Sequence, residues 1–267
     1  MTRSDGGSSY PGTWVVLPTY DEAQNLPGIA AAILAALPGA TLLVVDDASP
    51  DGTGALADRL AESDSSIQVM HRPGKEGLGK AYRAGFSVAL DGGASRIVQM
   101  DADWSHSPDY LPILMTALDD GADLVIGSRY VRGGGVRDWG LMRRVVSRGG
   151  SVFARTVLSL EPHDLTGGFK AWRRAALQTI DWDRVHSGGY VFQIETTYLA
   201  SRAGARVAEV PIVFKDREVG TSKMSKGIIV EAFQVVLQLR WDELRGRGPK
   251  RSGALVAPEA SPDDPPR

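Results

Sequence analysis

Short apolar runs alternate with segments of helical spacing over the first half of the chain. Four of the runs are rich in β-branched residues, which is typical of buried strands: residues 13–17, 41–45, 96–100 and 123–126. The segments that follow them carry apolar residues three to four positions apart: residues 25–37, 53–62, 79–90 and 107–118. This order predicts an α/β fold in which one mostly parallel sheet is flanked by helices on both faces, in a single domain.

The second half of the chain is less regular. Residues 133–139 are rich in glycine and predict a mobile loop. Further elements are expected as a strand at 166–172, a helix at 191–203, a strand at 205–214 that Pro211 restricts to an edge, and a helix at 226–241. The expected organisation is a disordered N-terminus over 1–12, a folded domain over 13–225, a C-terminal amphipathic helix over 226–245 and a disordered tail over 246–267.

One uncharged stretch, residues 23–45, is about as long as a bilayer-spanning helix, for which roughly 20 residues suffice. Pro27-Gly28 and Pro38-Gly39 interrupt it, so a helix, a turn and a strand explain it better than a membrane span. The first ten residues are polar and lack the apolar core of a secretory signal. We therefore expect the protein in the cytoplasm.

Composition narrows the chemistry. The net charge of -2 and the isoelectric point of about 6.1 exclude a globally basic nucleic-acid-binding protein. The chain has no cysteine, which excludes disulfides and thiolate metal sites. Any metal ion must therefore be held by oxygen atoms or by the four histidines.

The ends of three predicted strands are acidic and polar, and ligands of parallel α/β sheets bind beyond the carboxyl ends of the strands. Asp101 and Asp103 follow the third strand and could bind magnesium or manganese together, although a lone pair of this kind is more often a surface turn. Asp46 and Asp47 follow the second strand, where a carboxylate could accept hydrogen bonds from a nucleoside. Residues 18–22, after the first strand, either line the same site or form an ordinary loop.

Several basic residues lie where they could contact anionic oxygens. Arg129 follows a strand, and Arg217 and Lys223 flank a glycine-containing loop. On the helix expected after residue 140, Arg143, Arg144, Ser147 and Arg148 form either a second phosphate site or a solvated face. His106 follows the aspartate pair and is interpreted as a structural residue. The chain has no Walker loop, dinucleotide fingerprint or nucleophile elbow.

Taken together, these motifs resemble those of the polyprenol- or dolichol-phosphate mannosyltransferases, which are inverting family-two glycosyltransferases. The resemblance runs from about Trp14 to Trp241 and rests on nine segments: residues 18–22, 46–53, 77–79, 101–106, 127–130, 147–149, 164–169, 189–195 and 220–223. Two departures are visible, since Asp21 replaces a common Asn, and Ser105 stands where some members have a Gln that could bind the metal.

The resemblance implies a GT-A fold, GDP-mannose as the donor and a polyprenyl phosphate as the acceptor. It assigns nucleotide-sugar binding to Pro18, Tyr20, Glu22, Val45, Asp47, Asp101, Ala102, Asp103, Arg129, Arg217 and Lys223. It places the divalent cation, Mg or Mn, on Asp101 and Asp103, and the acceptor phosphate on Arg129, Arg143 and Ser147. Asp103, Arg129 and Arg217 are the residues expected to support catalysis directly.

The expected reaction is one displacement at the anomeric carbon, with inversion. A phosphate monoester is already anionic at pH 7 and needs no strong base, so the protein's task is positioning and charge neutralisation. The helix at 226–241 suits either a membrane surface or ordinary core packing. We expect a peripheral protein on the cytoplasmic face of a membrane, with an integral-membrane tethering protein as a possible partner. The alternatives are a related transferase using UDP-glucose and a noncatalytic subunit.

Overall fold

The computed structural model of the protein describes residues 9–185, 187–215 and 226–249, without the side chains of Tyr190 and residues 226–229. The strands are β1 (Thr13–Thr19), β2 (Thr41–Asp46), β3 (Ile67–His71), β4 (Arg96–Gln99), β5 (Leu124–Ser128), β6 (Gly135–Val136), β7 (Lys170–Arg173), β8 (Val207–Pro211) and β9 (Val213–Phe214). The α-helices are α1 (Leu26–Ala36), α2 (Thr53–Ser63), α3 (Leu78–Asp91), α4 (Leu111–Asp119), α5 (Leu141–Leu158), α6 (Arg174–Gln178), α7 (Gly189–Ala203) and α8 (Lys226–Leu244). Two 3-10 turns, Pro108–Tyr110 and Trp182–Arg184, complete the described elements.

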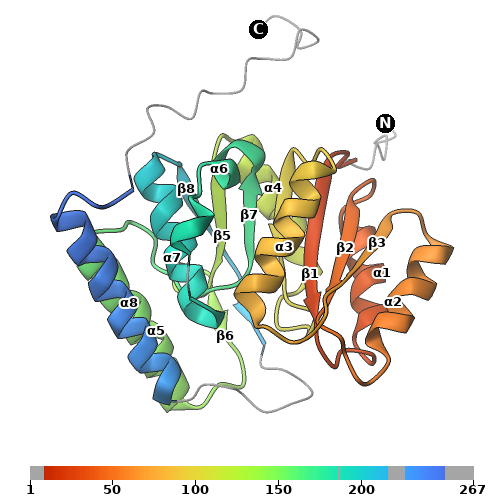
Figure 1. The fold of residues 1–267 in the computed structure, drawn as a ribbon, viewed down its shortest axis with the longest axis horizontal. Helices are drawn as coiled ribbons and strands as arrows, with labels where there is room; N and C mark the ends of the chain where they lie inside the picture. The colour runs from red at the N-terminus through yellow and green to blue at the C-terminus, as the bar shows by residue number, and fades with distance from the viewer. Residues whose placement is uncertain (1–8, 186, 216–225, 250–267) are drawn as a thin grey trace, which may run out of the picture.

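Seven strands form the central sheet in the order β3-β2-β1-β4-β7-β5-β8 (Figure 1). All neighbours pair in parallel except β7, which runs antiparallel to both β4 and β5. The strand with Pro211, β8, lies at the edge of the sheet, as the sequence predicts. A short parallel pair, β6 with β9, lies beside it. The expectation of a mostly parallel α/β sheet is thus confirmed.

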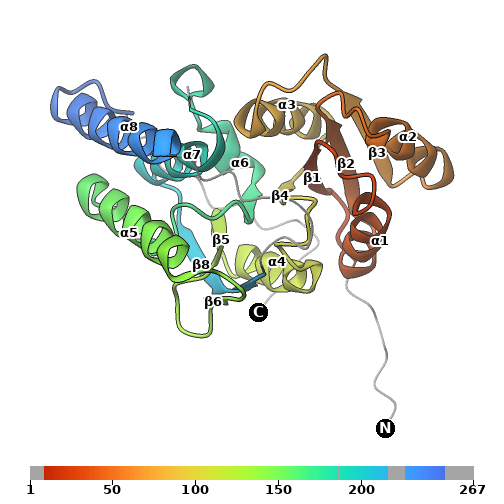
Figure 2. The ribbon, with the colours of Figure 1, turned by 90° about the horizontal axis from the view of Figure 1, so that it is seen from below.

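Helices cover both faces of the sheet because its strands bury side chains in both directions. In β1, Trp14 and Val16 pack with α3, α6 and α7, whereas Val15 and Leu17 pack with α1, α2 and α4 (Figure 2). Gly85 allows α3 to approach β1 closely, since a Cβ at this position would lie 2.4 Å from the Cγ1 of Val16. Each face of the sheet therefore carries one hydrophobic core.

Helices α5 and α8 lie side by side along one flank of the molecule, next to α7 (Figures 1 and 2). Phe153 of α5 packs against Phe233 of α8 with ring centroids 4.2 Å apart, and Arg202 of α7 forms an ion pair with Glu243 at 2.7 Å. Val236 of α8 is 1% exposed and belongs to the core. Within the described ranges, none of the helices has the length and apolarity that crossing a bilayer requires.

The structure corrects the sequence-based boundaries in the irregular half. The strand expected at 166–172 begins only at Lys170, because residues 164–169 form a loop that enters the sheet from the opposite direction. The loop expected at 133–139 contains β6, whose Gly135 and Val136 pair with β9. Strand β3 was not predicted, since Gln68 and His71 interrupt its apolar pattern at the edge of the sheet. The N-terminal and C-terminal segments 1–8 and 250–267, both expected to be disordered, lie outside the described residues.

Candidate active site

A cleft of about 400 Å³ opens where β2, β1 and β4 end. These three strands are neighbours in the sheet, so the three polar strand ends converge as the sequence predicts. The cleft is lined by Pro18, Thr19, Tyr20, Glu22, Asp47, Lys75, Gly77, Leu78, Ala81, Asp101, Ala102, Asp103, Arg143, Thr166, Gly168, Gly189 and Gln193. Eight residues of the predicted site are in that set: Pro18, Tyr20, Glu22, Asp47, Asp101, Ala102, Asp103 and Arg143.

Each of the three strand-end loops contains one non-glycine residue with left-handed backbone. Asp21 follows β1, Ala48 follows β2 and Trp104 follows β4, with φ angles of 61°, 55° and 61°. Such a conformation costs about 1–3 kcal/mol for a residue with a Cβ, and it persists where neighbouring contacts hold it. The shared geometry shows that all three loops turn sharply at the rim of the cleft.

Asp46 holds these loops together and does not line the cleft. Its carboxylate accepts hydrogen bonds from the Thr19 hydroxyl at 3.1 Å, the Ser49 hydroxyl at 2.5 Å and the Ser49 backbone N–H at 3.1 Å. The interpretation of both Asp46 and Asp47 as nucleoside ligands is therefore wrong for Asp46, because its oxygens are used internally. Asp51, two residues before α2, accepts a hydrogen bond from the N–H of Thr53, the first residue of that helix, at 3.0 Å.

Asp47 lies at one end of the cleft, paired with an arginine that the sequence analysis missed. Arg72, directly after β3, donates to Asp47 Oδ1 and, at 2.7 Å, to Glu76 Oε2. Both Asp47 and Arg72 are buried. Close by, Lys75 Nζ lies 3.4 Å from the centre of the Tyr20 ring. This end of the cleft combines an aromatic face, a buried carboxylate and two cations, a combination suited to an aromatic base with hydroxyl groups nearby.

Asp101 and Asp103 lie together in the middle of the rim. The Tyr82 hydroxyl donates to Asp101 Oδ1 at 2.7 Å, and the Ser105 backbone N–H donates to Asp103 Oδ1 at 3.1 Å. Burial of Tyr82, together with the charge of Asp101, raises the pKa of the phenol well above its usual value, so Tyr82 remains a hydrogen-bond donor. Both residues are therefore held in place by hydrogen bonds, and both line the same cleft.

Asp101 and Asp103 can supply only some of the ligands of a magnesium or manganese ion, because such an ion takes about six oxygen ligands. In the described portion of the chain, His and acidic side chains form no group of three or more that could complete the shell. Ser105, at the position of the absent Gln, has a buried hydroxyl with no hydrogen-bond partner among the described residues. The aspartate pair thus fits a cation whose remaining ligands come from substrate oxygens and water.

His106 is structural, as the sequence analysis holds. Its ring stacks on Phe169 with centroids 5.0 Å apart, and its Nδ1 accepts a hydrogen bond from the Asp101 backbone N–H at 3.3 Å. Burial lowers the pKa of His106, against the opposing effect of Asp101 and Asp103. The neutral ring of His106 therefore packs against the loop that carries Asp101 and Asp103 and holds it in place.

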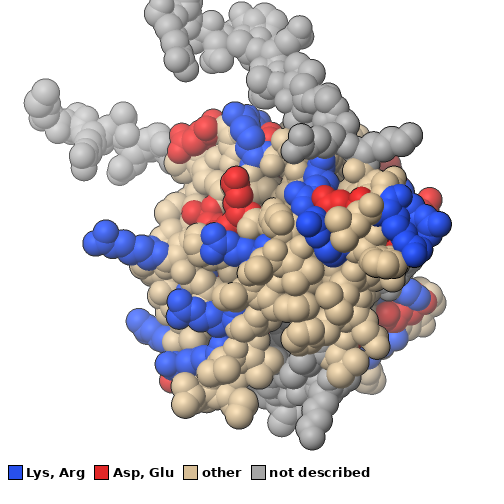
Figure 3. All heavy atoms as spheres, turned by 90° about the vertical axis from the view of Figure 1, so that its left-hand side faces the viewer, with Lys and Arg blue, Asp and Glu red and all other residues tan. Residues whose placement is uncertain are grey.

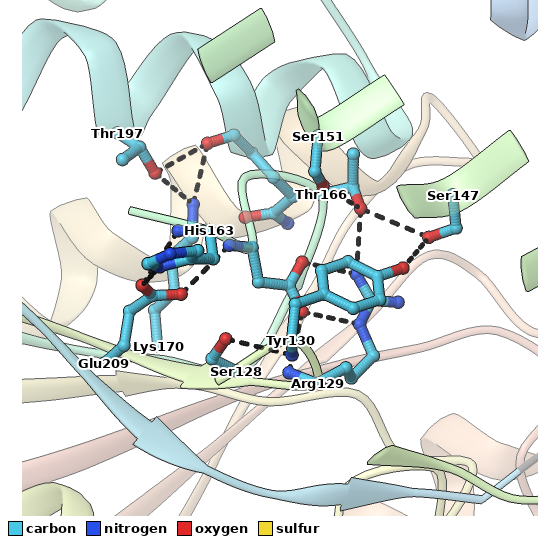
Figure 4. Close-up of polar contacts among 12 residues, drawn as sticks. Ser128, Arg129, Tyr130, Ser147, Ser151, His163, Thr166, Lys170, Thr197 and Glu209 are labelled. Atoms are coloured by element: carbon cyan, nitrogen blue, oxygen red, sulfur yellow. Dashed lines mark hydrogen bonds and ion pairs between the residues drawn. The ribbon is translucent and has the colours of Figure 1, made fainter. Parts of the chain in front are cut away.

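Arg129 is committed to a buried ion pair with Asp164 (Figure 4). Its Nε and Nη2 donate to the two carboxylate oxygens, each at 2.6 Å, and Nη2 also donates to the Thr166 hydroxyl at 2.8 Å. Burial by itself would raise the pKa of Asp164, but the charge and hydrogen bonds of Arg129 outweigh it and lower that pKa. Arg129 therefore lies behind Thr166, which lines the cleft, and its role as a phosphate ligand remains a prediction.

Helix α5 carries two of the residues predicted to bind an acceptor phosphate, Arg143 and Ser147. Arg143 lines the cleft and its guanidinium carbon lies 4.1 Å from the centre of the Trp139 ring. One turn further along the helix, Ser147 accepts a hydrogen bond from the Tyr130 hydroxyl at 2.7 Å and lies 3.5 Å from the Thr166 hydroxyl (Figure 4). Of the residues predicted to bind an acceptor phosphate, only Arg143 lines the cleft, whereas Arg129 and Ser147 contact the hydroxyl of Thr166, which lines it.

Three further predicted residues are not seen at the cleft. Val45 is fully buried in the core, so a nucleotide contact from it would come from its main chain. Arg217 and Lys223 lie outside the described residues. Their assignment to the diphosphate remains a prediction.

Comparison with known proteins identifies the family of this arrangement. The family model described as "Glycosyl transferase family 2" matches residues 14–181. The polyprenol monophosphomannose synthase of Mycolicibacterium smegmatis is 49% identical over 91% of this chain and 91% of its own length. The undecaprenyl-phosphate mannosyltransferase of Micrococcus luteus is 47% identical over 87% of this chain and 97% of its own length.

Solved structures show the same fold at lower identity. The mannosyltransferase PcManGT from Pyrobaculum calidifontis, solved with GDP-Man and Mn2+, superposes with a TM-score of 0.58 at 20% identity, covering 90% of this chain and 66% of that one. Glucosyl-3-phosphoglycerate synthase from Mycobacterium tuberculosis gives a TM-score of 0.56 at 20% identity, covering 92% and 82%. The cleft therefore lies on a GT-A glycosyltransferase fold. From the family model and from relatives at nearly half identity over almost the whole chain, the protein belongs to glycosyl transferase family 2 and, within it, to the polyprenol-phosphate mannosyltransferases.

Proposed function

We propose that the protein transfers mannose from GDP-mannose to a polyprenyl phosphate, with inversion at the anomeric carbon. The observation that carries this proposal is the pairing of Asp101 and Asp103 in one cleft with Arg143 of α5. The aspartates supply a cation site for a sugar diphosphate, and the arginine supplies a positive charge for a second anionic substrate. The names of the two curated relatives support mannose and a polyprenyl phosphate as the substrates.

The donor would lie along the cleft from Asp47 to Asp101. Tyr20 and Lys75 offer a stacking surface with a nearby charge for the base, and the carboxylates of Glu22 and Asp47 offer acceptors for N–H and O–H groups. A divalent cation bound at Asp101 and Asp103 would neutralise charge on the departing diphosphate. Tyr82 and Ser105 hold these carboxylates in place, so little reorganisation is needed during the reaction.

The transfer itself needs no protein base. An oxygen of the acceptor phosphate forms a bond to the anomeric carbon, and the bond from that carbon to the diphosphate breaks with its electron pair going to GDP. Arg143 would attract and orient the attacking phosphate, with Ser147 and Thr166 beside it. Arg129 orders this wall through Thr166 and Asp164, and the predicted Arg217 and Lys223 would add charge at the diphosphate.

A membrane surface is the proposed location of the acceptor. Apart from Ile113, the large apolar side chains that are exposed in the described residues all lie on the two flank helices: Leu141, Met142, Val145 and Val152 on α5, and Val230, Phe233, Leu237, Trp241 and Leu244 on α8. Figure 3 shows, on this side of the molecule, an area without charged side chains that is bordered by groups of Lys and Arg, with Asp and Glu in the upper part of the view. Arg144 and Arg148 of α5 are exposed as well. An apolar surface with arginines nearby fits the headgroup region of an anionic bilayer.

The proposed location is the cytoplasmic face of the membrane, where sugar nucleotides are available, with an integral-membrane protein as a tether. Copurification of such a protein with the enzyme from detergent-solubilised membranes tests the tether. Recovery of the enzyme alone, with its activity towards membrane-embedded acceptor intact, would argue against it.

Product formation is the direct test of the function. We expect the wild-type protein to form a mannosyl phospholipid, identified by mass, from GDP-mannose and a polyprenyl phosphate in the presence of Mg2+ or Mn2+. Excess chelator should abolish turnover, and Asp103→Asn should reduce it by about 100-fold or more, as loss of a group that stabilises the departing charge does. Asp120→Asn, at an exposed position after α4, is the matched control.

The same assay separates the alternatives. UDP-glucose is included because glucosyl-3-phosphoglycerate synthase, which shares the fold, was solved with UDP-Glc and Mn2+. If product forms with UDP-glucose and not with GDP-mannose, UDP-glucose becomes the assigned donor. Turnover that survives Asp103→Asn and chelation would refute metal-assisted transfer, and absence of any product would favour a noncatalytic subunit.

A further inference from the structure

One polar group at the cleft has no role in the reaction so far described. Gln193, in the first turns of α7, is 2% exposed and lines the cleft. Its side-chain oxygen accepts a hydrogen bond from Gln99 Nε2 at 2.6 Å, while its Nε2 has no hydrogen-bond partner among the described residues. A buried amide N–H group without a partner lowers stability, so such a group in a binding cleft points to a ligand.

The position of Gln193 is fixed from both sides. Lys170, fully buried in β7, donates to the Gln193 backbone oxygen at 2.8 Å and to the Thr197 hydroxyl at 2.9 Å (Figure 4). Gln99, at the end of β4, holds the side-chain oxygen. With the main chain and the side-chain oxygen both anchored, the amide nitrogen is held in place next to Gly168, which also lines the cleft. Exchange of the O and N atoms in both glutamines would still leave one unpaired hydrogen-bonding atom there.

Gly168 defines what the amide nitrogen faces. A Cβ built on Gly168 would lie 3.6 Å from Gln193 Nε2, 3.6 Å from Asp101 Oδ2 and 3.6 Å from the Cε1 of His106. The amide nitrogen and a carboxylate oxygen thus border the same small space. In the strand order β2-β1-β4-β7, Asp47 follows β2, the aspartates follow β4 and Gly168 precedes β7, so this space lies beyond the aspartates from Asp47.

We propose that Gln193 recognises the transferred sugar, by donating a hydrogen bond from Nε2 to a hydroxyl group of the hexose. The proposal rests on the proposed function, because a sugar nucleotide is linear: with its base near Asp47 and its diphosphate at Asp101 and Asp103, its hexose occupies the space at Gly168. An amide donor beside a carboxylate acceptor suits a hydroxyl, which both donates and accepts. Gln193 is therefore a specificity residue for the donor sugar.

The test compares binding of GDP-mannose with binding of GDP, each with Mn2+, by titration calorimetry. We expect Gln193→Met to weaken GDP-mannose by about tenfold while GDP affinity changes less than twofold, because only the sugar contact is lost. Gln178→Met, at an exposed position of α6, is the matched control and should leave both affinities unchanged.

Gly168→Ala is the second variant. Its methyl group meets its neighbours at ordinary contact distance, so the protein should fold, yet the methyl fills the space beside Nε2. It should also weaken GDP-mannose selectively. Equal weakening of GDP and GDP-mannose in the two variants would assign Gln193 to the diphosphate and overturn the proposal, as would a wild-type ratio of the two affinities in a folded Gln193→Met protein.

Failure of the donor assignment is recognised separately. If the wild-type protein forms product from another sugar nucleotide and not from GDP-mannose, the proposed donor is wrong. The same comparison is then made with that sugar nucleotide and its own nucleoside diphosphate, and the selective effect of the two variants is expected again. Its absence there refutes the role of Gln193.

Discussion

For Arg129, the sequence indicates a place near the site but does not reveal the ion-pair partner. Its place after a strand marks it as a candidate for the cleft, but its partner Asp164 is 35 positions away and follows an irregular segment. The bidentate geometry and complete burial of Asp164 appear only in three dimensions. Arg72 was missed for a related reason, since the strand before it was not recognised.

Removing the charge of Asp164 should destabilise the protein strongly. We expect Asp164→Asn to lower the free energy of unfolding by about 3–5 kcal/mol, because the buried guanidinium of Arg129 loses its counterion. Urea unfolding at pH 7 measures the change. The matched control is Asp183→Asn, whose ion pair with Arg83 is exposed and should contribute less than about 1 kcal/mol. Equal effects of the two substitutions would contradict the assignment of a buried, structural ion pair.

Lys170 should make stability depend on pH above neutrality. Burial lowers the pKa of its ammonium from 10.5 to about 7. Between these values the unfolded chain binds a proton that the folded protein does not, so the free energy of unfolding should rise as pH increases from about 7 towards 10.5. Well below pH 7 Lys170 is protonated in both the folded and the unfolded state, so its contribution to the free energy of unfolding no longer changes with pH. The slope is at most about 1.4 kcal/mol per pH unit.

Urea unfolding of the wild-type protein and Lys170→Met at pH 7, 8 and 9 isolates this effect. The variant lacks the titrating group, so the difference in unfolding free energy between the two proteins should change with pH in favour of the wild type. A constant difference over this range would show that Lys170 keeps its ordinary pKa.

At the scale of elements, the sequence predicts α8 as an amphipathic helix; core packing is confirmed for part of it, and contact with a membrane stays a prediction. Val236 and Phe233 pack against the rest of the molecule, while Leu237 and Trp241 are exposed. The contribution of α5 to the same surface was not predicted, because pairing of two helices about seventy positions apart in the chain leaves no local pattern. Deleting α8 would uncover α5 and α7, so point substitutions are the cleaner test.

Membrane association should depend on the exposed side chains of this flank. Leu237 is exposed in the protein and would be buried in the bilayer. Burial of a leucine side chain contributes about 1.5–3 kcal/mol, so we expect Leu237→Asp to weaken sedimentation with vesicles of anionic phospholipid by about tenfold or more. Ala55→Asp adds the same charge at an exposed position of α2, on the opposite side of the molecule (Figure 1), and should have a much smaller effect. Equal binding by both variants would show that α8 does not contact the bilayer.

At the scale of the molecule, the regular half of the fold was predicted closely and the other half was not. Strands β1, β2 and β4 each carry enough apolar residues to be recognised, and their polar ends identify the rim. Strand β7 has four residues and is preceded by Gly167 and Gly168, so neither its start nor its direction could be inferred from periodicity. Gln193 was missed because a helical glutamine carries no signal of its unpaired amide.

Ligand binding should stabilise the whole molecule, because the cleft joins loops from several parts of the sheet. At a GDP concentration of 100 times its dissociation constant with Mn2+, the free energy of unfolding should increase by about 2.7 kcal/mol. A thermal melt measures this as a higher midpoint. Chelator should remove most of the increase, and Asp103→Asn should do the same without chelator. An increase that needs neither the metal nor Asp103 would place GDP elsewhere.

The reversed direction of β7 has a consequence for how such enzymes diversify. Because β7 is antiparallel, the segment that enters it, and not the one that leaves it, supplies Thr166 and Gly168 to the cleft. Insertions or deletions before residue 164 could therefore remodel this side of the cleft while the strands that frame the nucleotide end keep their register. The two ends of the cleft can then diverge independently on one scaffold.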